Sequence, residues 1–263
     1  MTIKYATLTD AIAAAAAAGI AHLGVWRESI AEMGAVRAGR LIRDAGLQVS
    51  TLCRGGFFTD SDAEGRLRAL ASNRTAIVEA QALSTRELVL VAGGLAPEDR
   101  DLPSARDRVA EAIGELVPFA VDHGVRLAIE PLHPMLCADR CVISTLSQAL
   151  DIAEQFPATA VGVVIDTYHL WWDPALRAQI ARAKGRIASF QLGDWVLPLP
   201  ANVALGRGHL GDGCIDFRSI ADVVDAAGYT GPVEVEIFNE AVWDTPTAQT
   251  VATVRDRFRR HFG

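Results

Sequence analysis

The feature that most constrains the fold is a junction that recurs four times along the chain. A helical pattern ends in a glycine, and a short β-type segment follows within a few residues. A glycine just past a helix end, followed by a strand, is the helix-to-strand half of a βαβ unit. The four junctions are Ala17-Ala18-Gly19-Ile20, Asp44-Ala45-Gly46-Leu47, Asp122-His123-Gly124-Val125 and Ala226-Ala227-Gly228-Tyr229.

Eight strands are expected from these junctions and from the apolar runs between them. They are IKYAT from Ile3, HLGVW from His22, QVSTLC from Gln48, ELVLVAGG from Glu87, RLAIEPL from Arg126, VGVVIDTYH from Val161, IASFQL from Ile187 and PVEVEIF from Pro232. Amphipathic helices separate them, two with predicted N-caps at Asp173 and Asp216. Eight strand–helix alternations in 263 residues favour a single (β/α)8 barrel over an open sheet. No linker divides the chain, so residues 1–263 are predicted to form one TIM barrel domain.

Composition excludes several classes of function. The net charge of -7 and a pI near 5.4 leave no basic surface for nucleic acid. No segment is long and apolar enough to span a membrane, and no Gly-rich phosphate loop follows a strand. The four cysteines show no CxxC spacing, as expected of reduced thiols. We therefore expect a cytoplasmic protein, a homo-oligomer, that acts on a small molecule.

Alternation along the late strands brings four oxygen-bearing side chains to one end of the barrel. Val163 and Ile165 are expected to face outward, so their neighbours face the lumen, where catalytic residues collect at the carboxyl ends of strands. Three converging carboxylates repel each other unless a cation lies among them. Oxygen ligands suit Mn²⁺ or Mg²⁺ better than Zn²⁺. The four residues are Glu130, Asp166, Gln191 and Glu236.

Several runs resemble the sugar phosphate isomerase/epimerase family of xylose isomerase-like TIM barrels, and the resemblance covers nearly the whole chain. They are WRE at Trp26, CRGGFF at Cys53, EPLHP, IDTYHLWWD, QLGDW, GRGHLGDGCIDF and VEVEIF. The resemblance implies one divalent metal, held by Glu130, Asp166, Gln191 and Glu236 at the ends of the fifth to eighth strands. Gln191 stands where the family usually has a histidine, so Co²⁺ or Zn²⁺ are alternatives to Mn²⁺ and Mg²⁺. It also implies that His169 and Arg207 contact the substrate.

Aromatic and basic side chains near strand ends suggest how a sugar is held. All five tryptophans lie at or just after the ends of predicted strands, and aromatic faces stack on the apolar faces of sugar rings. Trp26, Trp172 and Trp195 are expected to contact the substrate in this way. Arg27 and Arg54 also follow strand ends, and they are expected to hold hydroxyl or carbonyl oxygens.

The expected activity is that of a metal-dependent isomerase or epimerase of keto-sugars. The metal chelates a carbonyl and an adjacent hydroxyl, and Glu130 and Glu236 remove and return the neighbouring proton through a metal-bound enediolate. The alternative is β-elimination by a lyase or dehydratase of 3-oxo-sugars or glycosides, as in C-glycoside deglycosidases, with His133 as the base. A third reading is a sugar-binding barrel without catalysis. An endonuclease IV type of enzyme is disfavoured, because it needs a histidine-rich multi-zinc site and a basic groove, whereas this chain has six histidines and a negative charge.

Overall fold

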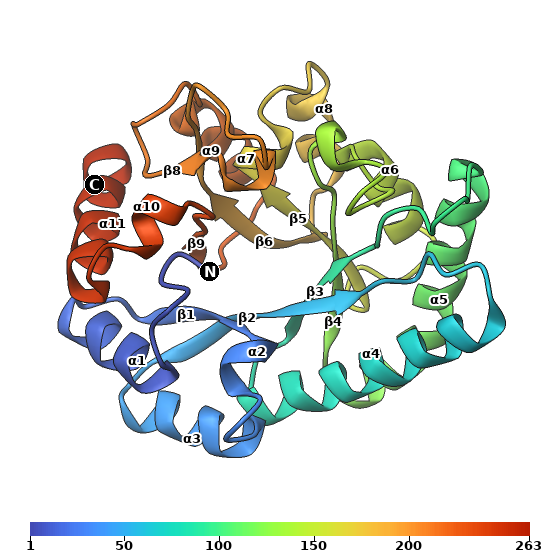
Figure 1. Cartoon of the computed structure of the whole chain (residues 1–263), viewed down its shortest axis with the longest axis horizontal. Helices are drawn as coiled ribbons and strands as arrows, with labels where there is room; N and C mark the ends of the chain where they lie inside the picture. The colour runs from blue at the N-terminus through green and yellow to red at the C-terminus, as the bar shows by residue number, and fades with distance from the viewer.

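Seven parallel strands form the wall of an almost closed barrel in the computed structural model, which describes residues 1–263 (Figure 1). Each strand pairs with the next along the chain, and the sixth pairs with the last. A two-stranded antiparallel ribbon, β7 (Asp194–Trp195) and β8 (Arg207–Gly208), lies outside this sheet. The barrel strands are β1 (His22–Trp26), β2 (Gln48–Gly56), β3 (Glu87–Val91), β4 (Arg126–Glu130), β5 (Val161–Asp166), β6 (Ile187–Leu192) and β9 (Val233–Val235). The predicted fold class is confirmed.

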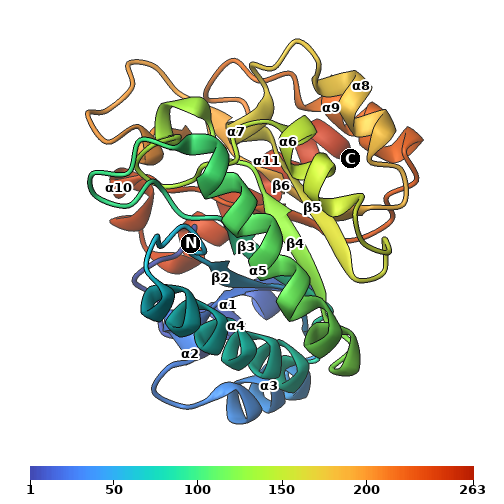
Figure 2. The ribbon, with the colours of Figure 1, turned by 90° about the vertical axis from the view of Figure 1, so that its right-hand side faces the viewer.

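Helices surround the sheet on its outer side (Figures 1 and 2). They are α1 (Leu8–Ala17), α2 (Arg27–Ile30), α3 (Ala35–Asp44), α4 (Ala63–Leu83), α5 (Leu102–Asp122), α6 (Leu146–Ala153), α7 (Thr167–Leu170), α8 (Leu176–Arg182), α9 (Phe217–Ala226), α10 (Glu240–Trp243) and α11 (Thr247–Phe262), with 3-10 turns η1 (Pro134–Leu136) and η2 (Val203–Leu205). None of these helices combines the length and the apolar character needed to cross a membrane.

The predicted helix-ending glycines all adopt a left-handed backbone. The φ angles of Gly19, Gly46, Gly124 and Gly228 are 69°, 75°, 67° and 84°. A Cβ atom at any of the four would meet nothing within 4 Å, so the backbone conformation alone selects glycine. The junctions from which the fold was predicted are confirmed.

The prediction that IKYAT forms the first strand is wrong, since residues 2–5 form turns and residue 6 a bend. The Ala6 N–H donates back to the Ile3 carbonyl (3.1 Å), because Thr7 already caps α1 and leaves little chain for a strand. Thr2 meets β9 through its hydroxyl, which donates to the Val235 carbonyl (2.8 Å). As a result β1 and β9 do not pair, and a seam remains between them.

One of the two predicted N-caps is correct. Asp216 accepts a hydrogen bond from the Ser219 N–H (3.1 Å) and caps α9 as predicted. Asp173 does not cap a helix, because α8 begins only at Leu176. Its carboxylate instead accepts from the Ala175 N–H (2.8 Å), which stabilises a turn before that helix.

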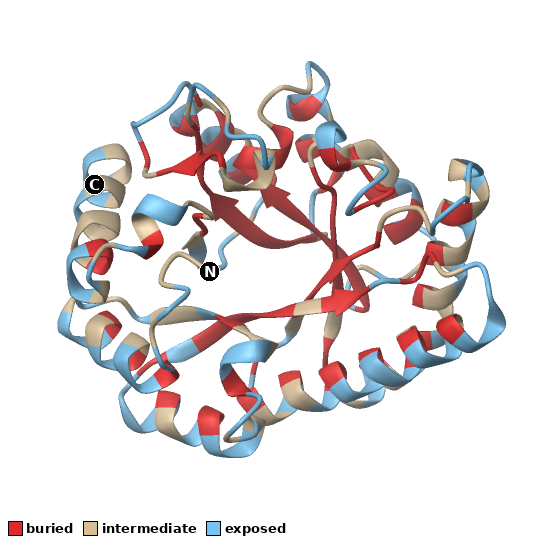
Figure 3. Cartoon of the chain, in the orientation of Figure 1, coloured by how far each residue is buried: buried red, intermediate tan, exposed pale blue.

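The hydrophobic core has two clusters, a large one between sheet and helices and a small one inside the barrel. Buried residues concentrate on the strands, and exposed ones on the outer helices (Figure 3). Val163 and Ile165 belong to the large cluster and Val164 to the small one in the lumen, as the alternation predicted. The small cluster contains mostly small side chains, which form a floor beneath the carboxyl ends of the strands. Its members are Cys53, Val89, Ala128, Val164 and Ala188.

Candidate metal and substrate site

The four predicted metal ligands are all buried at the carboxyl ends of barrel strands. Glu130 ends β4 and Asp166 ends β5, while Gln191 lies in β6. Glu236 follows β9, where its N–H donates to the Leu192 carbonyl of β6 (2.9 Å). The exposed fractions of Glu130, Asp166, Gln191 and Glu236 are 4%, 0%, 3% and 9%. Burying charged groups to this extent is costly unless each one is paired.

Arg207, from the antiparallel ribbon, supplies one positive charge to this group. Its Nη1 lies 2.8 Å from Asp166 Oδ2 and 3.3 Å from Glu236 Oε2, and it donates to the Glu236 carbonyl (3.1 Å). Negative charge still predominates. Burial, followed by the charges of Glu236 and Asp166, raises the pKa of Glu130 well above its usual range. The site therefore has the electrostatic character of a cation site.

The hydrogen bonding of two of these side chains also fits a divalent ion. Asp166 Oδ1 accepts from the Tyr168 N–H (2.8 Å). Asp166 Oδ2 lies 2.8 Å from Arg207 Nη1 and 3.9 Å from His169 Nε2 and has no aligned hydrogen bond. Gln191 Nε2 donates to Glu234 (3.2 Å), which leaves Gln191 Oε1 buried without a donor. Buried acceptors are rarely left without a partner. Carboxylate and amide oxygens are the ligands that Mn²⁺ and Mg²⁺ prefer, so the residues fit such an ion.

His169 is close enough to join this group. Ligand atoms of Glu130, Asp166 and His169 lie within 4.8 Å of one another. However, His169 Nδ1 accepts the backbone N–H of His133 (3.1 Å), and burial lowers the pKa of the ring well below its usual value. A neutral ring whose Nδ1 accepts carries its proton on Nε2. Nε2 is then a donor, which suits the predicted contact with a substrate oxygen better than metal ligation.

The protonated Nε2 of His169 faces Arg207. Nη2 of Arg207 lies 2.9 Å from this nitrogen. Both groups are then donors, so they do not satisfy each other. An acceptor oxygen within hydrogen-bond reach of both nitrogens would satisfy both.

His133 is arranged in a similar way. Its Nδ1 accepts the Met135 N–H (3.2 Å), and burial lowers the pKa of the half-buried ring. The neutral ring therefore also presents an N–H at Nε2. The ring lies against Trp195 and Trp172, with centroids 4.8 Å and 5.7 Å away. This geometry makes His133 a hydrogen-bond donor within an aromatic wall.

Two groups of aromatic side chains line the ends of the strands. Trp195 contacts Tyr168 and Trp171 at 4.8 Å and 5.5 Å between centroids, on the His133 side. Trp26 packs against Phe238 at 5.6 Å in the second group. The Arg207 guanidinium carbon lies 4.9 Å from the Tyr168 ring and 5.2 Å from the Phe238 ring, so it connects the groups. Tyr168 and Phe238 were not predicted as site residues, although each lies within a run that the sequence analysis singled out, IDTYHLWWD and VEVEIF.

Sequence reasoning also missed Asp194, which organises the loop that carries Arg207. Its buried carboxylate accepts four backbone N–H groups: from Trp195 (2.9 Å), Gly211 (2.9 Å), Gly213 (2.8 Å) and Ile215 (3.1 Å). A Cβ atom at Gly213 would come within 2.1 Å of the Trp195 carbonyl, so glycine is required there. The aspartate of QLGDW and the glycines of GHLGDG were visible signals of this arrangement.

The two arginines that were predicted to hold substrate oxygens lie in different surroundings. Arg27 is not brought to the site, because it begins α2 and its Nε pairs with Glu79 on α4 (2.5 Å). Arg54 lies near the second aromatic group, with its guanidinium carbon 5.1 Å from the Trp26 ring and 5.2 Å from the Phe57 ring.

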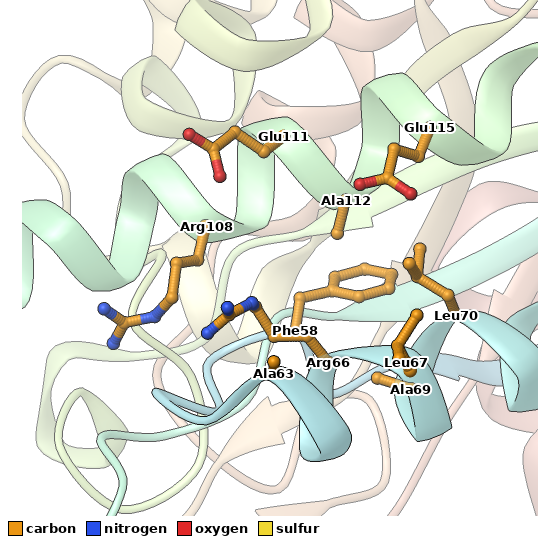
Figure 4. Close-up of a pocket in the computed structure, with 10 residues that line it drawn as sticks. All are labelled: Phe58, Ala63, Arg66, Leu67, Ala69, Leu70, Arg108, Glu111, Ala112 and Glu115. Carbon is orange, nitrogen blue, oxygen red and sulfur yellow. The ribbon is translucent and has the colours of Figure 1, made fainter.

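Two hollows elsewhere on the molecule lack this chemistry. One of about 250 Å³ lies between α4 and α5, where Arg66, Arg108, Glu111 and Glu115 surround Phe58 (Figure 4). Arg108 is already paired with Asp99 (2.5 Å). The other, of about 500 Å³, lies at the amino ends of the strands, opposite the end where barrel enzymes place their active sites.

Comparison with known proteins gives a consistent picture. The family model described as xylose isomerase-like TIM barrel matches residues 10–261. A crystal structure of a protein from Sinorhizobium meliloti 1021 superposes with a TM-score of 0.95 at 44% identity, covering 98% of this chain and 95% of that one. Inosose isomerase of Halalkalibacterium halodurans is 24% identical over 76% of this chain and 70% of its own length.

A third relative is named as a dehydratase and not as an isomerase. The 3-dehydroshikimate dehydratase of Pseudomonas aeruginosa PAO1 is 27% identical over 92% of this chain and 38% of its own length. The family itself is settled by the model that spans almost all of the sequence and by the relative at 44% identity. The chain belongs to the xylose isomerase-like TIM barrel family.

Proposed function

We propose that this protein is a divalent-metal-dependent isomerase or epimerase of keto-sugars. The observation that supports it most is the buried group of ionisable side chains at the carboxyl ends of the strands. Glu130, Asp166 and His169 offer ligand atoms within 4.8 Å of one another, and Arg207 pairs with both Asp166 and Glu236. The similarity to inosose isomerase supports the same class of reaction. We propose Mn²⁺ or Mg²⁺ as the ion, because all four predicted ligands offer oxygen.

In this proposal the two glutamates transfer the proton. A divalent ion at the site would polarise the substrate carbonyl and offset the negative charge that develops on oxygen. Glu130 and Glu236 take a proton from the carbon beside the carbonyl and return it. Burial and the neighbouring carboxylates raise the pKa of Glu130 in the metal-free protein, and a raised pKa makes a carboxylate a stronger base. The Nε2–H groups of His169 and His133 orient substrate oxygens, since neither ring offers a lone pair there.

Elimination remains the second candidate, favoured by the similarity to 3-dehydroshikimate dehydratase over 92% of this chain. The same deprotonation would expel a leaving group placed β to the carbonyl. The predicted base for that reaction, His133, has its Nδ1 engaged with the Met135 N–H. For this reason we place isomerisation first.

We expect removal of the metal with a chelator to abolish activity, and Mn²⁺, Mg²⁺ or Co²⁺ to restore it. The measurement is exchange of substrate C–H into D₂O, followed by NMR over a panel of keto-sugars and 3-oxo-glycosides. Isomerases return deuterium to the substrate, whereas a dehydratase yields an unsaturated product. Undiminished exchange in a preparation that elemental analysis finds free of metal would contradict the proposal.

Metal binding should weaken below about pH 6. Burial, opposed by Arg207, raises the pKa of Asp166 from its ordinary 3.8 to about 6. In the metal-free protein this group's contribution to stability is fully present below about pH 4, and it is lost as the pH rises through about 6. A metal needs the ionised carboxylates of both Asp166 and Glu130, and the pKa of Glu130 is also raised. Its affinity should therefore fall at least about tenfold for each pH unit below about pH 6.

Calorimetric titration with Mn²⁺ at pH 5 and pH 7.5 tests this dependence, with the Mn²⁺-induced rise in Tm as a second readout. Both the affinity and the rise in Tm should be larger at pH 7.5. Equal affinity at the two pH values would show that the ion does not compete with a proton on Asp166.

A further inference from the structure

Arg54 is a half-buried cation at the carboxyl end of β2 for which the structure shows no partner of opposite charge. The other arginines near the strand ends are engaged. Arg207 pairs with Asp166 and Glu236, and Arg27 pairs with Glu79. Arg54 makes neither a hydrogen bond nor a salt bridge, and its guanidinium lies against the Trp26 and Phe57 rings. Its N–H groups are therefore available to a ligand.

Phe57 is held in an unfavourable conformation beside this arginine. Its φ is 61°, and its N–H donates to the Val91 carbonyl (2.9 Å). A left-handed backbone is unfavourable at a bulky residue, because its Cβ atom crowds the backbone. Phe57 is 48% exposed, so the burial of its side chain offsets little of this unfavourable backbone energy. What the conformation does provide is the contact with the Arg54 guanidinium, 5.2 Å from the ring centroid.

The Trp26 side connects this arginine to the metal site. Trp26 packs on Phe238, and the Phe238 ring contacts the guanidinium of Arg207. Arg207 in turn pairs with two proposed metal ligands. Arg54 thus lies against the second aromatic group, through its contact with Trp26. Aromatic contacts of this kind restrict a guanidinium group while its N–H groups remain free to donate.

We propose that Arg54, held by Trp26 and Phe57, binds a carboxylate of the substrate, so that the substrate is a keto-sugar or cyclic polyol bearing an acid group. This inference rests on the proposed function and names its substrate class. A carboxylate has two oxygens that match the fork of one guanidinium group. A phosphate dianion would call for a second positive charge, and Arg207 is already engaged with Asp166 and Glu236.

Matched pairs of sugars test the carboxylate subsite. Mn²⁺-loaded protein is titrated calorimetrically with D-fructuronate and D-fructose, and with D-ribulose 5-phosphate and D-ribulose. We expect the acid to bind at least about tenfold more tightly than D-fructose, as a charge-assisted pair would give. Arg54→Gln should abolish this preference, so that the acid and D-fructose bind this variant with equal affinity. Arg54→Lys should keep part of the preference, and Arg74→Gln, on the exposed face of α4, should keep all of it.

Three results would overturn the inference: equal binding of D-fructuronate and D-fructose, an unchanged acid preference in Arg54→Gln, or a larger preference for the phosphorylated member of the second pair. Deuterium exchange separates this failure from failure of the proposed function. Exchange into D-fructose without an acid preference contradicts the carboxylate subsite alone. An Arg54-dependent acid preference without exchange into any sugar supports the subsite and contradicts the isomerase.

Discussion

Glu130→Gln and Glu236→Gln will each lower turnover by about a thousandfold or more, and each will remove exchange of the substrate C–H with solvent. Both follow from assigning the proton transfer to the two carboxylates. His133→Ala will lower turnover only about tenfold to a hundredfold, because its ring donates a hydrogen bond and does not accept the proton. Deuterium exchange and steady-state rates measured on the same preparations test all three variants.

Metal content must be measured for each glutamate variant, since both residues are also proposed ligands. Glu111→Gln is a matched control, because Glu111 lies on α5 outside the barrel and is exposed. Loss of all exchange in His133→Ala, with metal retained, would identify the histidine as the base and favour elimination over isomerisation.

Replacing Asp194 by alanine will destabilise the protein by about 3–5 kcal/mol. The substitution leaves four backbone N–H groups without their acceptor in a buried loop. It will also lower activity, because β7 and β8 pair through Asp194↔Gly208 and Trp195↔Arg207, and this ribbon holds Arg207 against Asp166. Urea denaturation measures the first effect, and exchange under conditions where the variant is folded measures the second.

Asp212→Ala is the control for this experiment, since Asp212 lies in the same loop and makes an exposed ion pair with Arg257 (2.9 Å). A surface pair of this kind contributes at most about 1 kcal/mol. Similar stabilities of the two variants would mean that water replaces the Asp194 carboxylate at little cost.

The parts of the site that lie in regular strands were predictable from the sequence. A strand alternates its side chains, so the apolar residues Val163 and Ile165 fixed the direction of Asp166, and the same rule oriented Glu130 and Glu236. The helix-ending glycines fixed the order of strands and helices in the same way, because their conformation depends only on neighbouring residues.

Features that depend on contacts between distant segments were not predictable. IKYAT has the composition of a strand, but it lies directly before the cap of α1. Arg27 follows a strand end, yet Glu79, more than fifty residues later, draws it to α4. The proton positions on His133 and His169 depend on backbone N–H groups that composition and spacing do not locate.

The hydrogen bond from the His133 backbone N–H to His169 Nδ1 determines what a substitution at position 133 can change. Its donor belongs to the main chain, and every amino acid except proline supplies it. The proton of His169 therefore stays on Nε2 whatever side chain evolution or mutagenesis places at position 133. The two histidines can be altered independently, so this loop can change its contacts with a ligand without altering the hydrogen-bonding character of the ring beneath it.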